Sequence, residues 1–423
     1  MSTTPPSTQP PAQQGAVPAD LQDERLIASQ GMSGAVSAFF GRLRSGDLGS
    51  LPVVVGLVVI WIVFQTLNSN FLSPRNLVNL TLQSAAIGTL ALGIVLVLLL
   101  GEIDLSVGSV AGVSAAVLAV GMMSRGWPTL VAVLAALVSG LLIGLLYGAL
   151  FTKFGVPSFV ITLAGLLGFL GLQLQVLGAE GSINIPFESG FVKFGQQMFL
   201  PQWLAWALVA ATVAITTLAR MRASAKRAAA GLSAPSMNST LLRAAGLAVL
   251  LAIPVLVLNR DRGVSVMFLV FLTLVVVFDL LLRKTRWGRS VMAVGGNVEA
   301  ARRAGINVRR VYLTVFAACS TLAALGGLFM AARLASANQS TGGGDNNLNA
   351  IAAAVIGGTS LFGGRGSAYS ALLGIIVIQS ISSGLSLLNL GTPIRYAVTG
   401  IVLLLAVTID SLSRRTRAAH GRG

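Results

Sequence analysis

Apolar stretches of about 20 residues follow one another along almost the whole chain from residue 51 onward. A helix of that length crosses the hydrocarbon layer of a bilayer. Only 10% of the 423 residues are charged and 55% are apolar, so a water-soluble fold could not cover this much apolar surface. The pattern therefore predicts an all-α, polytopic integral membrane protein with about 10–12 transmembrane helices. The predicted spans are residues 51–67, 80–100, 105–123, 128–150, 156–178, 201–219, 241–258, 264–282, 311–332, 348–362, 367–388 and 394–411.

The positions of the basic residues predict the orientation in the membrane. Twelve crossings place both termini on one side. With the N-terminus inside, 22 of the 29 basic residues fall on the inner side, mainly in residues 220–243, in residues 283–310 and in the C-terminal tail. The positive-inside rule then favours cytoplasmic N- and C-termini of a bacterial plasma-membrane protein. A re-entrant hairpin would keep the same parity, so complete crossings and re-entrant segments both remain open. The net charge of +16 could also indicate nucleic-acid binding, but the positions of the basic residues explain it as an orientation signal.

The two ends of the chain differ from the apolar region between them. Residues 1–24 are rich in Pro, Ser, Thr and Gln and hold few large apolar side chains, which predicts a disordered cytoplasmic tail within residues 1–50. Residues 25–45 are either an interfacial helix or an unstructured lead-in. No basic region followed by an apolar core resembles a cleaved signal peptide there. Residues 412–423 are expected to form a basic cytoplasmic tail, and residues 51–411 the transmembrane domain.

Two glycine-rich segments resemble each other. GEIDLSVGS at residues 101–109 and GGTSLFGGRGS at residues 357–367 each follow one apolar stretch and open the next. Downstream of each comes a matching pair, Gly155-Val156-Pro157 and Gly391-Thr392-Pro393. We expect two similar, parallel halves with an inserted helix pair between them, as duplication is a common way to build transporters. The alternative is that Gly-Ser turns simply recur between apolar helices.

The segment 283–310 is too polar to cross lipid. Glu299-Ala300-Ala301 followed by Gly305 predicts a short helix with a glycine stop, and Asn297 is its expected N-cap after a turn at residues 295–297. A compact helix on the inner surface is what a membrane subunit needs in order to be moved by a cytoplasmic motor. The alternative is a basic loop held against anionic lipid headgroups.

Two acidic residues lie near the core of the first half. Glu102 and Asp104 could line a pathway, cap the helix that begins near Ser106, or face water on the inner side. Asp279 is expected to pair with Arg283 at a span end. Further polar candidates for a pathway are Gln83, Gln173, Gln175, Asn338 and Asn346, although packing or hydrogen bonding between helices is the favoured explanation of each single residue.

These motifs together resemble a known family. GRSVMAVGGN at residues 288–297, the EAA-then-glycine helix, and AGINVRR at residues 304–310 are similar to the membrane permeases of bacterial ATP-binding-cassette sugar importers. GEIDLSVGS and AAAVIGGTSLFGGRGS resemble the ribose/xylose/galactose branch. The resemblance covers about residues 51–413. The extra pair of spans around 201–258 and the NRDRGV turn at 259–264 resemble the D-xylose permease subtype.

The resemblance implies a division of labour among several chains. The permease would work as a pair of copies that carries a monosaccharide, D-xylose, inward across the plasma membrane, with a separate cytoplasmic ATPase and an extracytoplasmic sugar-binding protein. Residues 283–310 would be the ATPase-coupling loop. The chain has no Gly-x-x-x-x-Gly-Lys-Ser/Thr motif, so we expect no bound cofactor and ATP held by the partner. The coupling residues carried over are Gly288, Arg289, Gly296, Asn297, Glu299, Ala300, Ala301, Arg302 and Gly305.

Two other functional classes were weighed. An ion- or proton-coupled secondary sugar transporter usually carries charged relays inside its bundle, and apart from Glu102 and Asp104 the spans are nearly free of charge. An intramembrane enzyme would need a nucleophile with a base or a metal cluster, and one cysteine and one histidine supply neither. The sequence therefore predicts a transport subunit without enzymatic activity and without a metal site.

Overall fold

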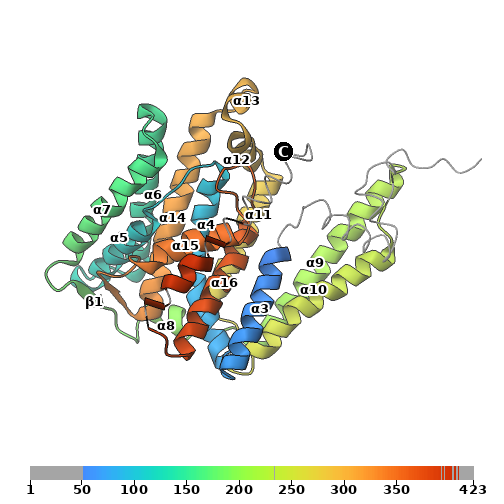
Figure 1. Cartoon of the computed structure of the whole chain (residues 1–423), viewed down its shortest axis with the longest axis horizontal. Helices are drawn as coiled ribbons and strands as arrows, with labels where there is room; N and C mark the ends of the chain where they lie inside the picture. The colour runs from blue at the N-terminus through green and yellow to red at the C-terminus, as the bar shows by residue number, and fades with distance from the viewer. Residues whose placement is uncertain are drawn as a thin grey trace, which may run out of the picture. The chain divides into compact units, whose positions relative to one another are not determined.

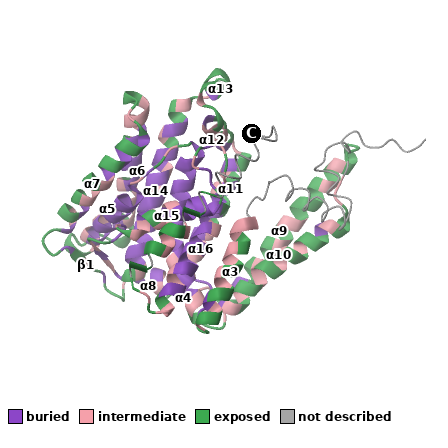
Figure 2. Cartoon of the chain, in the orientation of Figure 1, coloured by how far each residue is buried: buried purple, intermediate pink, exposed green. Residues whose placement is uncertain are grey.

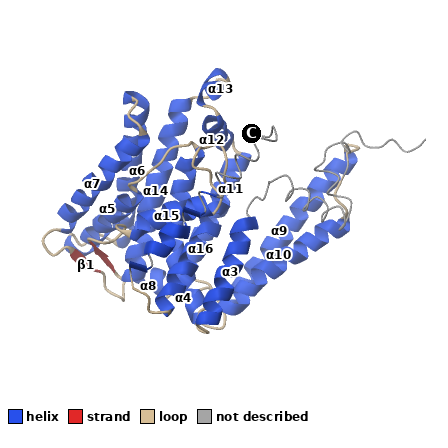
Figure 3. Cartoon of the chain, in the orientation of Figure 1, coloured by secondary structure: helices blue, strands red, loops and turns tan. Residues whose placement is uncertain are grey.

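The computed structural model describes residues 51–232, 234–391, 393–394, 396–402, 404–405 and 408. The predictions for the two tails, residues 1–50 and 412–423, lie outside these residues. The described part is all-α apart from one two-stranded ribbon, and nine of its helices are long and apolar enough to cross a membrane (Figures 1 and 3). The elements are α3 (Leu51–Leu67), α4 (Pro74–Leu99), α5 (Val107–Ala119) continued by a π-helical turn (Val120–Ser124), α6 (Thr129–Phe154), α7 (Ser158–Leu177), β1 (Ser182–Asn184), α8 (Gly190–Gln196), α9 (Gln202–Ala229), α10 (Met237–Leu258), α11 (Val266–Lys284), α12 (Arg286–Gly296), α13 (Val298–Arg303), α14 (Val308–Leu334), β2 (Ser336–Asn338), α15 (Asp345–Ile356) and α16 (Ala368–Leu387).

The chain divides into two compact units, and α9 and α10 supply most of the described residues of the smaller one. The larger unit is organised around α4 and α14, which are buried along most of their length (Figure 2). Glycines let these two helices approach closely: a Cβ on Gly93 would lie 2.9 Å from the carbonyl oxygen of Cys319. Small residues at helix contacts are typical of membrane bundles, in which van der Waals packing rather than the hydrophobic effect holds helices together.

The segment between α4 and α5 does not stay at the end of α4. The two central helices are antiparallel, with Gly93 against Cys319 and Ala86 against Gly326. Cys319 lies 11 residues into α14, about 17 Å along its axis. Its thiol is 3.7 Å from the carboxylate of Asp104. Residues 100–106 therefore run from the end of α4 back toward the middle of α14, and α5 begins near half depth.

The helix α15 is the partner of this interrupted helix. It has 12 residues and is about 18 Å long, so the predicted crossing at residues 348–362 is wrong as a complete span. The Asn347 side chain near its start donates to Leu105 O at 2.7 Å and accepts from Gly108 N at 3.3 Å. The N-terminal ends of α5 and α15 thus meet inside the bundle. A 12-residue helix inside the bundle therefore stands in place of the predicted complete span.

The two ends of the larger unit are built differently. At one end, α12 and α13 continue from α11, and the loop 357–366 lies against them. At the other end, β1 and β2 pair antiparallel with Ser182 opposite Asn338, and α8 packs against the last turns of α14 through Gly195 and Ala332. The predicted similarity of two parallel halves is not tested by these contacts and stays a prediction.

Candidate functional site

The junction between α11 and α12 is held by a helix cap and by close backbone packing. Thr285 is the N-cap of α12, and its hydroxyl accepts a hydrogen bond from Gly288 N at 3.1 Å. A side chain at Gly288 would overlap the backbone carbonyl oxygens of Leu281 and Leu282. These contacts fix the angle between α11 and α12. Neither Gly288 nor the helix pattern in the sequence predicted this fixed angle.

The short helix predicted around Glu299 is α13, and both of its predicted caps are confirmed. Asn297 Oδ1 accepts from Ala300 N at 2.9 Å, which is an N-cap bond. At the other end Gly305 adopts φ +79°, and Ile306 N donates to Ala301 O at 3.1 Å. Glycine adopts this left-handed conformation without strain, whereas any residue with a Cβ would be sterically strained there. The predicted turn at residues 295–297 is wrong in part, because Gly295 and Gly296 are the last residues of α12 and only Asn297 is extended.

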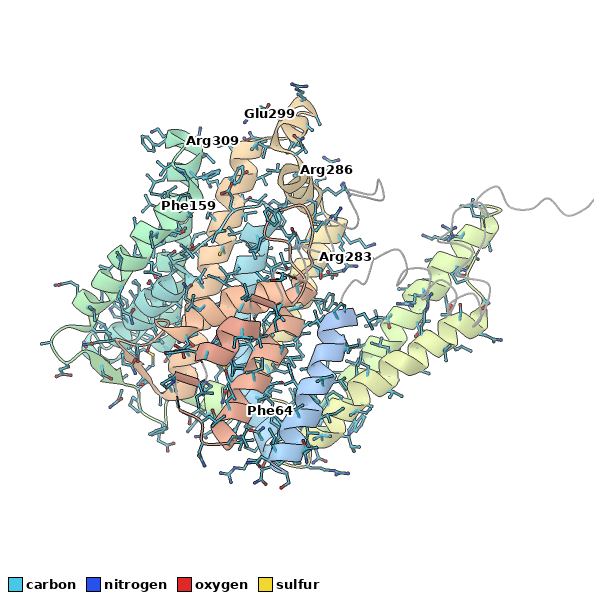
Figure 4. The ribbon with its side chains drawn as sticks, viewed as in Figure 1. Phe64, Phe159, Arg283, Arg286, Glu299 and Arg309 are labelled. Atoms are coloured by element: carbon cyan, nitrogen blue, oxygen red, sulfur yellow. The ribbon has the colours of Figure 1, made fainter. Side chains whose placement is uncertain are left out.

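The α12–α13 segment presents a charged surface. Arg289, Glu299, Arg302 and Arg303 are exposed, and Glu299 pairs with Arg302 one turn away, while Ala301 is buried underneath. Figure 4 shows Glu299 at the tip of this end of the bundle, with Arg309, Arg286 and Arg283 on the same end. Arg283 also pairs with Asp279 at 2.8 Å, as the sequence predicted. An acidic or mixed-charge cleft on another chain would complement this surface.

The underside of α12 contacts two other segments through backbone atoms. A Cβ on Gly295 would overlap the carbonyl oxygen of Leu99, the last residue of α4. The same carbonyl accepts a hydrogen bond from Gly364 N at 2.9 Å. Gly101 and Gly363 face each other in the left-handed region at φ +79° and +83°. The end of α12, the end of α4 and the 357–366 turn are thus in direct backbone contact, so no side chain can absorb a movement of α12.

Asp104 belongs to a buried network at the start of α5. Its Oδ1 accepts from Ser106 N at 2.8 Å and from Ser106 Oγ at 2.7 Å, and Tyr147 OH donates to Ser106 Oγ at 2.7 Å. Asp104 is 1% exposed. The N-cap of α5 is Ser106 itself, so Asp104 fixes the turn before the cap. Of the three alternatives, capping of α5 by the Asp104 side chain is not what is found, because the carboxylate bonds Ser106, the N-cap residue, and no side chain caps the first turn of α5.

Glu102 lies closer to the α12–α13 end. Ser158, the first residue of α7, donates to Glu102 Oε2 at 2.5 Å, and the Tyr312 hydroxyl of α14 also hydrogen-bonds this carboxylate. Burial raises the pKa of Glu102, and the two hydrogen bonds oppose that shift. Glu102 therefore ties residues 100–106 to the neighbouring ends of α7 and α14.

The remaining polar candidates lie on separate elements, and two of them, Gln173 and Asn346, donate to backbone carbonyls. Gln173 is fully buried, and its Nε2 donates to Asn338 O at 2.8 Å and to Thr341 O at 3.1 Å. Asn346 donates to Gly343 O in its own turn, and Gln83 is half-buried on α4. The residue that joins the interrupted helices is Asn347, which the sequence reasoning missed in favour of its neighbour.

The described residues contain no group of three or more His, Cys, Asp or Glu side chains that could hold a metal ion. Their polar groups instead connect helices: the buried network around Asp104, the Glu102 cluster, and the backbone contacts below α12. These bonds join neighbouring segments of the larger unit to one another.

Comparison with known proteins agrees with this arrangement. A family model described as the permease component of the branched-chain amino acid transport system matches residues 76–407. The xylose transport system permease protein of Escherichia coli K12 is 36% identical over 380 residues, covering 90% of this chain and 96% of that protein. The corresponding protein of Haemophilus influenzae is 34% identical, covering 88% and 99%. The ribose import permease protein of Bacillus subtilis is 34% identical, covering 86% and 94%.

No solved structure matched the chain. The match to the family model spans most of the chain, and the relatives are covered almost from end to end. Permeases of this family are multi-pass inner-membrane subunits that work with an ATPase and a substrate-binding protein, and they are not enzymes. This chain therefore belongs to the family of membrane permease components of bacterial ATP-binding-cassette transport systems.

Proposed function

We propose that this chain carries a monosaccharide, D-xylose, inward across the plasma membrane as the permease subunit of an ATP-driven importer. The observation that carries the proposal is the capped α12–α13 segment, which stands at the basic end of the bundle and rests on α4 and the 357–366 turn through backbone atoms. The choice of a pentose follows the xylose and ribose permeases among the relatives.

The α12–α13 segment is the element that we assign to the ATPase partner. Glu299, Arg302 and Arg303 provide exposed charges for a cleft on that partner, and Ala300 keeps the helix thin enough to enter it. Gly288 and Gly305 fix the two ends of the segment, one by close packing and one by its left-handed backbone. A push on this segment reaches Leu99 through Gly295 without an intervening side chain.

The proposed orientation has both termini and α12–α13 in the cytoplasm, and β1, β2 and α8 outside, where a sugar-binding protein would dock. The excess of basic residues on one side supports it. Thiol labelling in whole cells tests it on a Cys319→Ala background. Glu188→Cys should react with a membrane-impermeant reagent and Ala304→Cys should not, because both positions are exposed but lie at opposite ends. The reverse labelling pattern would overturn the orientation.

The sugar pathway is proposed to form with a second copy of the chain. Asn347 and the Nε2 group of Gln173 bond backbone atoms of the same copy, whereas Gln173 Oε1 is buried without a hydrogen-bond partner. A permease that receives sugar from a binding protein can hold it weakly.

Reconstitution tests the function directly. Proteoliposomes with this chain, its ATPase and its binding protein should accumulate labelled D-xylose only when ATP is supplied on the ATPase side, and ribose serves as the comparison sugar. Uptake that persists without ATP and collapses with an ionophore would instead establish a secondary transporter.

A further inference from the structure

The smaller unit contains a pocket that the transport function does not use. It lies between α9 and α10 and has a volume of about 490 Å³. Six of its lining residues are apolar and three are polar: Leu218, Met221, Ala225, Ala228, Pro235 and Met237, with Arg222, Ser224 and Thr240. Ser224 Oγ donates to Pro235 O at 3.3 Å, which joins the two sides of the pocket next to its polar residues.

The pocket lies where these helices would leave the hydrocarbon layer. The helix α9 has 28 residues and is about 42 Å long, which is longer than the roughly 30 Å hydrocarbon thickness. Trp203 and Trp206 near its start are the aromatic residues typical of one membrane interface. Arg220 follows 17 residues after Trp203, about 25 Å along the axis, and marks the other interface. The pocket begins at Leu218 and so straddles that second boundary.

The charged residues of α9, α10 and the segment that joins them have one sign. Residues 202–258 contain five basic residues and no Asp or Glu. Four of the basic residues fall in the second half of α9 and one in the second turn of α10, namely Arg220, Arg222, Lys226, Arg227 and Arg243. The helix α10 begins at the pocket and α9 ends there, so their opposed dipole ends offset each other and the basic side chains set the local field.

We propose that this pocket binds an anionic phospholipid, with the phosphate near Arg222 and Ser224 and the start of an acyl chain against Leu218, Met221 and Met237. A ligand with a charged head joined to hydrocarbon fits a pocket that is basic at its rim and apolar along its walls. An acidic peptide would leave the apolar wall unmatched, and a free phosphate would leave it empty. Leu218 and Met237 are 51% and 54% exposed, and the bound lipid would cover these side chains.

Lipid retention by the full-length purified chain tests the proposal. Native mass spectrometry in detergent would compare added phosphatidylglycerol with phosphatidylcholine of the same acyl chains. We expect selective retention of phosphatidylglycerol. Arg222→Gln should weaken it about fivefold, the factor that corresponds to about 1 kcal/mol for one basic residue at an anionic surface. Ala225→Phe, which keeps every charge but fills the pocket, should weaken it to a similar or greater extent.

The control is Lys153→Gln, because Lys153 is an exposed basic residue at the end of a different helix, α6. It should leave retention unchanged. Equal retention of the two lipids, or unchanged phosphatidylglycerol retention in both pocket variants, would overturn the proposal. Loss of retention in Lys153→Gln would also overturn it, because nonspecific charge would then explain binding.

A chain lacking residues 1–47 is a second test. If it binds lipid several-fold more tightly than the full chain, the N-terminal arm, and not a lipid, is the occupant of the pocket. The melting temperature in phosphatidylcholine shows whether each variant is folded, and no ATPase is needed, so the result is separate from the transport assay.

Discussion

Two glycines three residues apart on α7 allow a matched test of the buried network at the start of α5. A Cβ on Gly165 would overlap the Tyr147 hydroxyl oxygen and lie 2.7 Å from the ring carbon that carries it. Ordinary contacts begin at 3.4 Å, so the ring must retreat by about 0.7 Å and the hydroxyl by more. A Cβ on Gly168 would meet nothing within 4 Å. We therefore expect Gly165→Ala and Gly168→Ala to act in opposite directions.

The magnitudes follow from the contacts. Alanine is favoured over glycine in a helix by about 1 kcal/mol, and both variants gain this term. Gly168→Ala should therefore be neutral or stabilising by up to about 1 kcal/mol. Gly165→Ala also incurs overpacking of about 1–3 kcal/mol and displaces the Tyr147 hydroxyl from Ser106, at about 1–3 kcal/mol for a buried group left without its partner. Its net effect is a destabilisation of about 1–5 kcal/mol.

The assay is thermal unfolding of the full-length chain in one detergent, followed by fluorescence. Gly165→Ala should melt at a lower temperature than the wild type and Gly168→Ala at the same or a higher one. Tyr147→Phe removes the clashing hydroxyl, so adding it to Gly165→Ala should cost less than the two single effects combined. Equal melting temperatures of the two alanine variants, or an additive double variant, would refute the reasoning.

Three further predictions concern the α12–α13 end. Gly295→Ala should overlap the carbonyl oxygen of Leu99, and in proteoliposomes it should lower the sugar moved per ATP hydrolysed while the chain still inserts; an unchanged ratio would contradict the contact's role. Glu299→Lys and Gly305→Arg should uncouple ATP hydrolysis from uptake without loss of expression, and normal uptake by both would remove the coupling assignment. Burial raises the pKa of Glu102, so the folded state holds the proton more tightly than the unfolded one, and stability should fall as pH rises from about 4.5 through the folded pKa. The melting temperature of Glu102→Gln should lack this pH dependence, and a wild type equally stable at all these pH values would contradict the shift.

Local features of the fold could be predicted from the sequence because their causes lie within a few residues. The caps of α13 at Asn297 and Gly305 depend only on the residues of the adjoining helical turn. The ion pair of Asp279 with Arg283 depends only on their spacing of four residues along one helix face. The apolar stretches likewise mark most crossings, since the length of a crossing is set by the bilayer.

The interrupted helices could not be predicted in the same way. Their geometry depends on Asn347 reaching Leu105, 242 residues away, and on the packing of Asp104 against Cys319. Nothing in the pattern around Asn347 separates it from Asn346. One signal was present, because the predicted span at 348–362 has 15 residues and is short of the length that crosses a bilayer. The contact of Gly295 with Leu99 also joins residues far apart in the sequence, and a glycine in the sequence does not indicate which backbone will lie against it.

The segment of residues 100–106 connects the proposed coupling surface with the middle of the bundle. Its first neighbour, Leu99, touches Gly295 of α12, and five residues later Asp104 fixes the start of α5. Between them Glu102 is tied to Ser158 of α7. Because this segment is short and bonded at several positions, a displacement of α12 would reach the start of α5 and the start of α7 together. The same displacement reaches α15 and α16 through Gly364, and the N-terminal ends of α5 and α15 are already joined by Asn347. The two interrupted helices would therefore move as one body when the ATPase moves α12, and α14 contacts the same segment through Tyr312 at Glu102 and Cys319 at Asp104. A single contact below α12 would then be enough to couple an ATPase to both halves of the bundle, which is why a methyl group at Gly295 is expected to alter coupling more than insertion.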